Sequence, residues 1–445
     1  MKILVHSSMK QRTRVQLDLV KMLSSYNKNL DFYFLIDSES MIKDVMPYKV
    51  ILLEKLRNNW FFNFFFTEIR QTFLLRLIRR TFYSVSVLIE AIFLYHELKK
   101  YYHWLLVRFK KERFDAIILN GDRHGNTEAV ILKIAKKLNI KSICPYYCLS
   151  DDVSLISNSY LLQLKFYSPL IVKLLFFLYK DHVFTYQSKK YFYYTPNIFL
   201  ALKWFGVLSK YPWYIGNGLV DVVCIDSLMT FNRYKENRVP EEKLKIIGDI
   251  NHQILYESSK NNIKQHYIDK YDLNPKNKII MCALPQLLEQ KTLSKKEHWE
   301  EINFLVDTCC KSKESVLLSL HPKMQFEEYR FLEKKYKCII LKESLAESLP
   351  IADLFLSINS STMIWPFYLG INSIILDYYN LYGAWFNSLD NITFSKNKNK
   401  LLDEIKKNLN IKKDFKSDWM KLSKDKVFDG KVIQRYSDLL ENLKT

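Results

Sequence analysis

Two similar segments in the second half of the sequence constrain the fold most. Each begins with an apolar run, passes through a short polar loop and continues with helical spacing: SVLLSLHPKM (Ser315–Met324) and ADLFLSINSSTMIWPFYLG (Ala352–Gly370). The loops contain His321 and Pro322 in the first segment, and Ser360, Ser361 and Thr362 in the second. A strand, loop and helix in this order place free backbone N–H groups at the helix start, where phosphate groups bind. Because parallel strands end at one edge of a sheet, we expect both loops in one crevice that fits a nucleotide mono- or diphosphate.

Strand and helix patterns also alternate along the rest of the chain. Apolar runs typical of buried strands include Lys2–His6, Phe114–Asn120, Ser142–Pro145, Val222–Ile225 and Ile279–Leu284. This alternation predicts an α/β protein with parallel sheets. A length of 445 residues exceeds one ordinary domain. We therefore expect α/β domains at residues 1–260 and 261–425, with a C-terminal helix in 426–445 that could pack back on the first domain.

Glycine and cysteine usage excludes several kinds of site. The chain has only nine glycines, and neither GxGxxG nor the P-loop pattern GxxxxGK[ST] occurs. Its seven cysteines form no CxxC pair, which favours reduced thiols in a cytoplasmic protein over a zinc site. The start, MKILVHSSMK, lacks the apolar core of a signal peptide. We expect no cofactor and no required metal.

Two segments, at about residues 58–113 and 160–215, are both aromatic and basic. They interrupt the α/β pattern, so we expect helical insertions in the N-terminal domain. Charged residues break their apolar runs below the about eighteen that a spanning helix needs. Aromatic rings interleaved with lysines suit helices that lie on an anionic membrane surface. Ordinary core helices with snorkelling lysines remain an alternative.

The charge of the whole chain is strongly positive, with 67 Lys and Arg against 47 Asp and Glu, or +20. Such a balance suits an anionic membrane or nucleic acid, although base bias in the source genome would also produce it. No RNA- or DNA-binding motif accompanies the aromatic residues, so we expect no nucleic-acid partner.

Several segments resemble the GT-B glycosyltransferases, whose two Rossmann-like domains face each other across a cleft. DAIILNGDRHGNTEAVILKIAKKLNIKSICP (Asp115–Pro145) is similar to the middle βαβ unit of the N-terminal domain in the branch related to UDP-N-acetylglucosamine 2-epimerases. DVVCIDSLMTFNRYKENRVPEEKLKIIGD (Asp221–Asp249) is similar to the last unit of that domain. The His-Pro and Ser-Ser-Thr loops resemble the nucleotide-binding loops of the C-terminal domain. The resemblance covers under half of the chain and implies a nucleotide-sugar-dependent glycosyltransferase of hexosyl or sialyl type.

The two loops also resemble those of enzymes with cytidine donors. His-Pro paired with Ser-Ser-Thr is similar to the motifs of bacterial sialyltransferases and 3-deoxy-ulosonic acid transferases, which use CMP-sugars. CDP-glycerol glycerophosphotransferases have a similar pair. Many UDP-dependent relatives hold the ribose with a glutamate just after the serines, where this chain has Ile364, Trp365 and Pro366. The resemblance therefore implies a cytidine nucleotide-activated donor, above all a CMP-nonulosonic or 3-deoxy-ulosonic acid.

The implied acceptor is a surface glycan or a lipid-linked molecule, as in the biosynthesis of a bacterial capsule or lipopolysaccharide. The protein would then work in the cytoplasm, peripherally associated with the inner membrane. Other readings stay open: a CDP-glycerol-type or UDP-sugar transferase, or a nucleotide-sugar epimerase or hydrolase of the same fold. A non-enzymatic, membrane-associated binding protein is a further alternative.

Polar residues at the predicted strand ends are the candidate site residues. Those for donor-nucleotide binding are His321, Pro322, Ser360, Ser361, Thr362, Gln286 and Glu343. An inverting transferase needs a general base, and Asp122 and His124 follow the predicted strand Phe114–Asn120. The acceptor side is assigned to Ser7, Ser8 and Lys10. Each also has an ordinary interpretation as a helix cap or a solvated loop residue.

No DxD pair stands at a strand end, so the sequence requires no metal. The charge that develops on the leaving group would instead be met by His321 and by helix dipoles.

Overall fold

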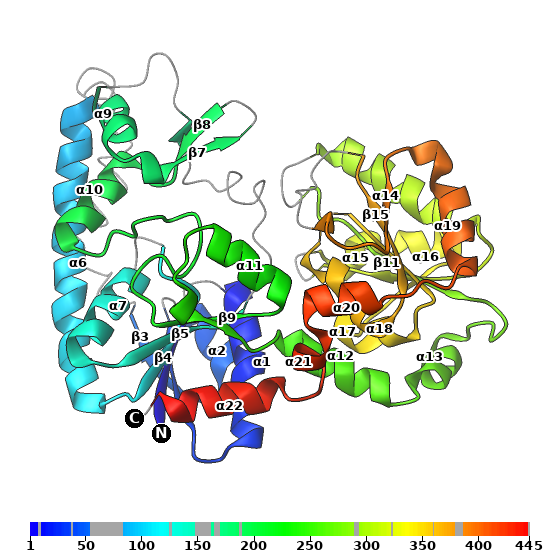
Figure 1. The fold of residues 1–445 in the computed structure, drawn as a ribbon, viewed down its shortest axis with the longest axis horizontal. Coiled ribbons are helices and arrows are strands. Elements are labelled where there is room, and N and C mark those ends of the chain that lie inside the picture. Colours follow the sequence, from blue (N-terminus) through cyan, green and yellow to red (C-terminus); the bar gives the residue numbers. More distant parts are fainter. Residues whose placement is uncertain are drawn as a thin grey trace. The chain divides into compact units, whose positions relative to one another are not determined.

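Two α/β units make up the chain, and each is built on a parallel sheet (Figure 1). The computed structural model describes residues 1–7, 10–36, 39–53, 83–123, 127–146, 162–163, 170–186, 189–288, 293–321, 324–358, 360–378 and 386–443. The first unit comprises residues 1–226, 230–247 and 433–445, and the second comprises 227–229 and 248–432. The prediction of two α/β domains with parallel sheets is confirmed.

The sheet of the first unit has the strand order β10-β9-β5-β4-β1-β2-β3, and all neighbours are parallel. Its strands are β1 (Lys2–Ser7), β2 (Asp31–Ile36), β3 (Lys49–Leu52), β4 (Ala116–Ile118), β5 (Lys141–Cys144), β9 (Val222–Ile225) and β10 (Leu244–Ile246). Ile3, Leu4 and Val5 of β1 are fully buried, as expected where helices cover both faces of a sheet. The chain moves outward from β1 to β3 and resumes on the other side with β4. The topological switch point of this sheet therefore lies between β1 and β4.

The described helices that belong wholly or mostly to the first unit lie within residues 10–236, except for one near the C-terminus. They are α1 (Lys10–Tyr26), α2 (Ile42–Val45), α6 (Tyr83–Glu112), α7 (Thr127–Leu138), α9 (Leu170–Leu178), α10 (Pro196–Phe205), α11 (Leu228–Glu236) and α22 (Val432–Asn442). α22 returns to this unit at the end of the chain, where Arg435 Nε donates to the carbonyl of Ile247 at 2.8 Å. Asn27 Nδ2, just after α1, donates to Ser437 Oγ of α22 at 3.0 Å (Figure 1).

An aromatic module, which we define as α6, α9, α10 and a small antiparallel sheet, occupies part of the first unit. The small sheet has the order β6-β8-β7, with β6 (Leu162–Gln163), β7 (Val183–Tyr186) and β8 (Lys189–Phe192). Segment 160–215 thus contains strands as well as the expected helices. Asn197 Nδ2 of α10 donates to Glu90 Oε2 of α6 at 3.0 Å, and the rings of Phe199 in α10 and Tyr179 after α9 lie 4.6 Å apart. α10 therefore contacts both of the other helices.

The sheet of the second unit has the order β13-β12-β11-β14-β15-β16, again with every pair parallel. Its strands are β11 (Ile279–Ala283), β12 (Ser315–Ser319), β13 (Ile339–Ile340), β14 (Leu354–Ser357), β15 (Asn372–Leu376) and β16 (Ile392–Ser395). β11, β12 and β13 extend to one side, and β14, β15 and β16 to the other. The switch point of this sheet lies between β11 and β14.

The helices of the second unit begin and end with recognisable sequence signals. They are α12 (Ile250–Lys260), α13 (Ile263–Tyr271), α14 (Lys295–Cys310), α15 (Phe326–Tyr329), α16 (Phe331–Tyr336), α17 (Leu345–Ser348), α18 (Trp365–Leu369), α19 (Leu401–Asn410), α20 (Lys416–Leu422) and α21 (Lys424–Val427). Ser294 caps α14 and exchanges hydrogen bonds with Glu297, which is a capping box. Gly370 ends α18 with a φ of 69°, a conformation that glycine adopts without strain. None of the helices in the described ranges is long and apolar enough to cross a membrane.

Candidate functional site

The carboxyl ends of the central strands in the second unit carry small residues that lie side by side. In the register of the sheet, Ala283 of β11 pairs with Ser319 of β12 on one side and with Ser357 of β14 on the other. Ser357 is 1% exposed, and no described residue hydrogen-bonds its hydroxyl. These three residues stand at the switch point, and open α/β sheets bind ligands at such a point.

The loop after β14 presents two hydroxyl groups that are bonded to each other. Ser360 is extended, with φ −133° and ψ 139°, and its Oγ accepts a hydrogen bond from the Thr362 N–H at 3.2 Å. The same Oγ lies 2.8 Å from Thr362 Oγ1. Ser361 opens the 3-10 helix η7 (Ser361–Ile364), which runs into α18. All three side chains are partly exposed, so this loop combines an N-cap with hydroxyls that solvent can reach.

His321 follows β12 and Gln286 follows β11, the two strands that precede β14 in the sheet order. His321 stands two residues beyond β12 and is partly exposed; its N–H donates to Met324 Sδ at 3.2 Å, and its carbonyl accepts from the Met324 N–H at 2.8 Å. This turn holds the backbone of His321 at the strand end. Gln286 stands three residues beyond β11, and its Oε1 is buried without a hydrogen-bond partner among the described residues. The register therefore brings the predicted Gln286, His321 and Ser360 to one edge of the sheet.

Glu343 lies at the edge of the sheet beyond β13 and has partners of its own. It forms a salt bridge with Lys270, and its Oε2 accepts from Tyr271 Oη at 2.6 Å. Burial alone would raise the pKa of Glu343, but the hydrogen bonds from Lys270 and Tyr271 outweigh it and the pKa is lowered. The Glu343 carboxylate thus connects the end of β13 to α13. Its contact with the nucleotide stays a prediction.

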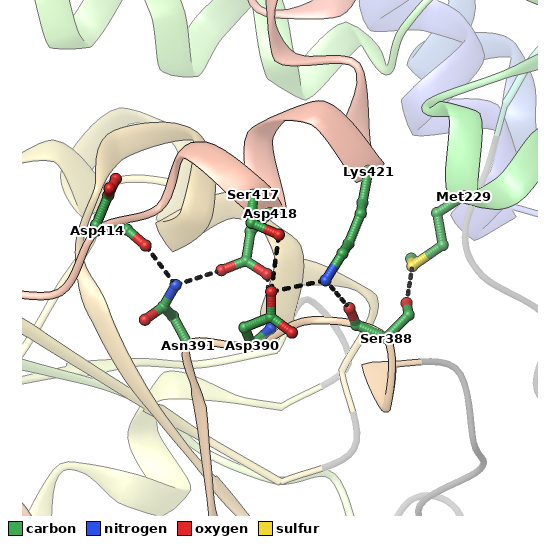
Figure 2. Close-up of polar contacts among 8 residues, drawn as sticks. All are labelled: Met229, Ser388, Asp390, Asn391, Asp414, Ser417, Asp418 and Lys421. Atoms are coloured by element: carbon green, nitrogen blue, oxygen red, sulfur yellow. Dashed lines mark hydrogen bonds and ion pairs between the residues drawn. The ribbon is translucent and has the colours of Figure 1, made fainter.

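The connection from β15 to β16 leaves the same edge, and its far end is fixed by polar contacts with α20 (Figure 2). The fully buried Asp418 accepts from the Asp390 N–H and from Asn391 Nδ2, both at 2.7 Å. Lys421 Nζ donates to Asp390 Oδ2 at 2.8 Å. These contacts set where the chain re-enters the sheet, at the amino end of β16 and therefore at the edge opposite the candidate site.

In the first unit, the predicted base Asp122 is buried and both of its carboxylate oxygens accept backbone hydrogen bonds. Oδ1 accepts from the Gly216 N–H at 3.0 Å and Oδ2 from the Gly218 N–H at 2.8 Å. The side chain of Lys243 binds the carbonyls of the same two glycines at 2.9 Å each. Burial raises the pKa of Asp122, and the two glycine amides oppose that shift. Asp122 and Lys243 together clamp the loop from Gly216 to Gly218.

The clamp requires a glycine at residue 218. A Cβ there would come within 2.5 Å of the Asp122 carbonyl oxygen and 2.8 Å of its carboxylate. The clamp favours a structural role for Asp122, since the two backbone N–H groups stabilise the charged carboxylate and weaken it as a base. Its catalytic role stays a prediction.

The other predicted residues are only partly described. His124, Ser8 and Pro322 lie outside the described residues. Ser7 ends β1 and Lys10 begins α1, so the backbone places both at the β1–α1 connection, on the carboxyl side of the sheet. Within the part of the chain that the structure describes, no three His, Cys, Asp or Glu side chains cluster as metal ligands would.

Several buried polar residues at the strand ends were not predicted as site residues from the sequence. Besides Ser357, they are His6 at the end of β1, Asn120 just after β4 and Glu128 in the first turn of α7, which are 0%, 2% and 0% exposed. His6 Nδ1 lies 4.0 Å from Glu128 Oε1. All three belong to the switch point between β1 and β4. His6 and Asn120 could have been found in the sequence, because each is a polar residue at the end of an apolar run, KILVH and FDAIILN.

Comparison with known proteins finds likeness in fold and none in sequence. No protein-family model and no curated protein matches the chain. A variant of the wall teichoic acid polymerase TagF has a TM-score of 0.56 at 12% identity, covering 100% of this chain and 89% of that one. UDP-GlcNAc 2-epimerase from Neisseria meningitidis has a TM-score of 0.53 at 11% identity, with 99% and 100% covered. The UDP-GlcNAc 2-epimerase of Methanocaldococcus jannaschii has a TM-score of 0.51 at 13% identity, also with 99% and 100% covered.

These likenesses extend over both units and confirm the predicted GT-B fold class. Identities this low establish the fold alone, so the chemistry has to be argued from the residues at the strand ends.

Proposed function

We propose that this chain is a glycosyltransferase that takes its sugar from a cytidine nucleotide-activated donor, above all a CMP-nonulosonic or 3-deoxy-ulosonic acid. The observation that carries the proposal is the carboxyl edge of the second sheet, where Gln286, His321, Ser357 and Ser360 follow or end three adjacent strands. Hydroxyl, imidazole and amide groups at a switch point are suited to a nucleotide. The fold neighbours support a nucleotide site: the M. jannaschii epimerase is in complex with UDP-GlcNAc and UDP, and a TagF structure was soaked with CDPG.

In this proposal the leaving nucleotide is stabilised by hydrogen-bond donors at the strand ends. The His321 imidazole donates to a phosphate oxygen, and the hydroxyls of Ser360 and Thr362 exchange their mutual bond for bonds to the donor. Donors aimed at charge that grows in the transition state lower the barrier, because they need no reorganisation when the bond breaks. The cytidine preference rests on the resemblance and on the missing glutamate after the serines. A CDP-glycerol-type transferase, a UDP-sugar transferase and an epimerase are the alternatives.

The acceptor side is proposed at the carboxyl edge of the first sheet. Ser7 ends β1, Lys10 begins α1 and Asp122 comes shortly after β4, so these three residues support a site at the switch point. Ser8 and His124, which lie outside the described residues, join the proposal by their positions in the sequence. An acceptor hydroxyl there would lose its proton to one of the last two residues. We further propose a glycan or lipid-linked acceptor at the cytoplasmic membrane face, on the basis of the basic and aromatic segments.

The nucleotide claim can be tested by thermal unfolding of the full chain with CMP, CDP, UMP or UDP. A ligand that binds only the folded state stabilises by about 2.7 kcal/mol at a hundred times its Kd. We expect CMP or CDP to raise the melting temperature more than the uridine nucleotides do. Ser360→Ala should reduce that shift, whereas Ser312→Ala, at the opposite edge of the same sheet, should leave it unchanged.

Turnover tests the role of the imidazole. With His321→Ala, the loss of one donor to a developing charge lowers turnover by roughly a hundred- to a thousandfold. The exposed His266 of α13 provides the control, because His266→Ala removes an imidazole away from the strand ends. Equal shifts with all four nucleotides would reject the cytidine claim, and normal turnover by His321→Ala would reject the role of His321.

A further inference from the structure

The outward side of α9 is apolar although nothing in the described structure covers it. Val172, Leu175 and Phe176 face the core of the first unit and are at most 8% exposed. On the other side, Leu174, Phe177 and Leu178 are 51%, 73% and 57% exposed. A helix that is apolar all round is normally buried on every side. Three large apolar side chains in two turns therefore indicate an interaction surface.

Basic residues lie on and just after α9, and the neighbouring helix α10 carries an exposed tryptophan. Lys173 and Lys180 are exposed on and just after α9. Trp204 of α10 is 44% exposed, and its neighbour Lys203 contacts the ring of Tyr179 at the end of α9. We call Lys173, Leu174, Phe177, Leu178, Lys180 and Trp204 the α9 face. The nearby Asp181 is engaged by Arg238, at 2.5 Å, so its negative charge is matched.

A second helix of the same module has an unburied apolar stripe. Val85, Leu88, Ile89 and Ile92 of α6 are 49%, 41%, 47% and 48% exposed. Their spacing of three, four and seven residues puts them on one side of the helix. The aromatic module thus presents exposed apolar side chains from α6 and α9, the two helices that α10 contacts.

We propose that the α9 face docks this protein on an anionic lipid surface. Leu174, Phe177 and Leu178 enter the boundary between headgroups and acyl chains, Trp204 lies at headgroup depth, and the lysines meet the anionic headgroups. A second copy of the chain fits the same face poorly, because a two-fold contact would bring together two copies of the same positively charged face. This inference rests on the geometry of the α9 face and does not depend on the nucleotide site.

The test is sedimentation of the full chain with vesicles of phosphatidylcholine, with and without phosphatidylglycerol. Wild type should bind the anionic vesicles more strongly. Phe177→Ser combined with Leu178→Ser should lower that binding at least about tenfold. The control Met420→Ser, on α20, removes an apolar side chain that is also 73% exposed and should change nothing.

A charge-reversal pair isolates the electrostatic part of the contact. Lys173→Glu with Lys180→Glu should lower binding by about thirtyfold or more, as expected from about 1 kcal/mol for each basic residue near such a surface. Lys276→Glu, in the exposed turn before β11, is the matched control. The thermal shift with cytidine nucleotides should be the same in all of these variants, which shows that they fold and separates this inference from the proposed function.

Three results would overturn the lipid assignment. One is binding of wild type to anionic vesicles that neither pair of substitutions weakens, and another is equal binding to neutral and anionic vesicles. The third is light scattering that shows a wild-type dimer which Phe177→Ser with Leu178→Ser converts to a monomer, since the α9 face would then bind a second copy.

Discussion

Replacing Asp122 with asparagine separates a structural from a catalytic role for this residue. The substitution keeps the size of the side chain but turns one acceptor oxygen into an NH2 group. Both carboxylate oxygens accept a glycine N–H, so in either orientation of the amide one N–H faces another donor. Asp122→Asn should therefore loosen the loop from Gly216 to Gly218 whether or not the residue also takes part in catalysis.

The size of the effect follows from the contacts. A hydrogen bond to a charged group contributes about 1.5–3 kcal/mol, and a buried donor left without a partner costs about 1–3 kcal/mol. The side chain of Asp122 is 6% exposed, so water does not replace the lost bond. We expect the free energy of unfolding of the first unit to fall by about 3 kcal/mol. Asp181→Asn is the control: this exposed aspartate pairs with Arg238 at the surface, where such a pair contributes about 1 kcal/mol or less.

Two measurements check this reasoning. Urea unfolding gives the free energy, and hydrogen exchange followed by mass spectrometry reports on the peptide that contains Gly216 and Gly218. Both amides should exchange faster in Asp122→Asn and at the wild-type rate in Asp181→Asn. Unchanged exchange and unfolding, together with a loss of transfer activity of a hundredfold or more, would refute the structural role and establish Asp122 as the base.

Two further predictions concern the stability of the first unit. Burial lowers the pKa of His182 from 6.5 to about 4, so the unfolded chain binds a proton that the folded chain does not, and stability should drop by about 3 kcal/mol as the pH falls from 6.5 to 4. Urea titrations across this range should show a smaller drop for His182→Phe, and an equal drop would assign the loss to other groups. Gly218→Ala should destabilise the first unit by at least about 2 kcal/mol, because the new Cβ has to displace the Asp122 backbone; a melting temperature equal to that of wild type would contradict this.

Local patterns predicted the central strands of both sheets well. The apolar runs at Lys2–His6 and Ile279–Leu284 became β1 and β11, because a strand buried on both faces has to be apolar at every position. The polar residues after such runs were predicted at strand ends, and the register places Gln286, His321 and Ser360 along one edge. Strand order could not be read from the sequence, yet it decides that Glu343 follows an edge strand while Gln286 lies at the switch point.

The roles of individual polar side chains were harder to predict, because their partners are distant in sequence. The glycines that bind Asp122 lie 94 and 96 residues further on, and Lys270 lies 73 residues before Glu343. No local pattern encodes such pairs. For the same reason the strands β7 and β8 were missed within a segment whose aromatic residues suggested helices, since their pairing depends on contacts made in the folded module.

The return of α22 to the first unit has a consequence for how this protein is made. The second unit is nearly continuous in sequence, from Gly248 to Val432, so all of it leaves the ribosome before the helix that completes the first unit. Domains generally fold as they emerge, and an incomplete one exposes apolar surface. Tyr436 and Leu440 of α22 are at most 3% exposed in the folded protein, so the surface that they cover stays open until α22 has been synthesised. The first unit, although its synthesis begins first, is therefore completed after the second.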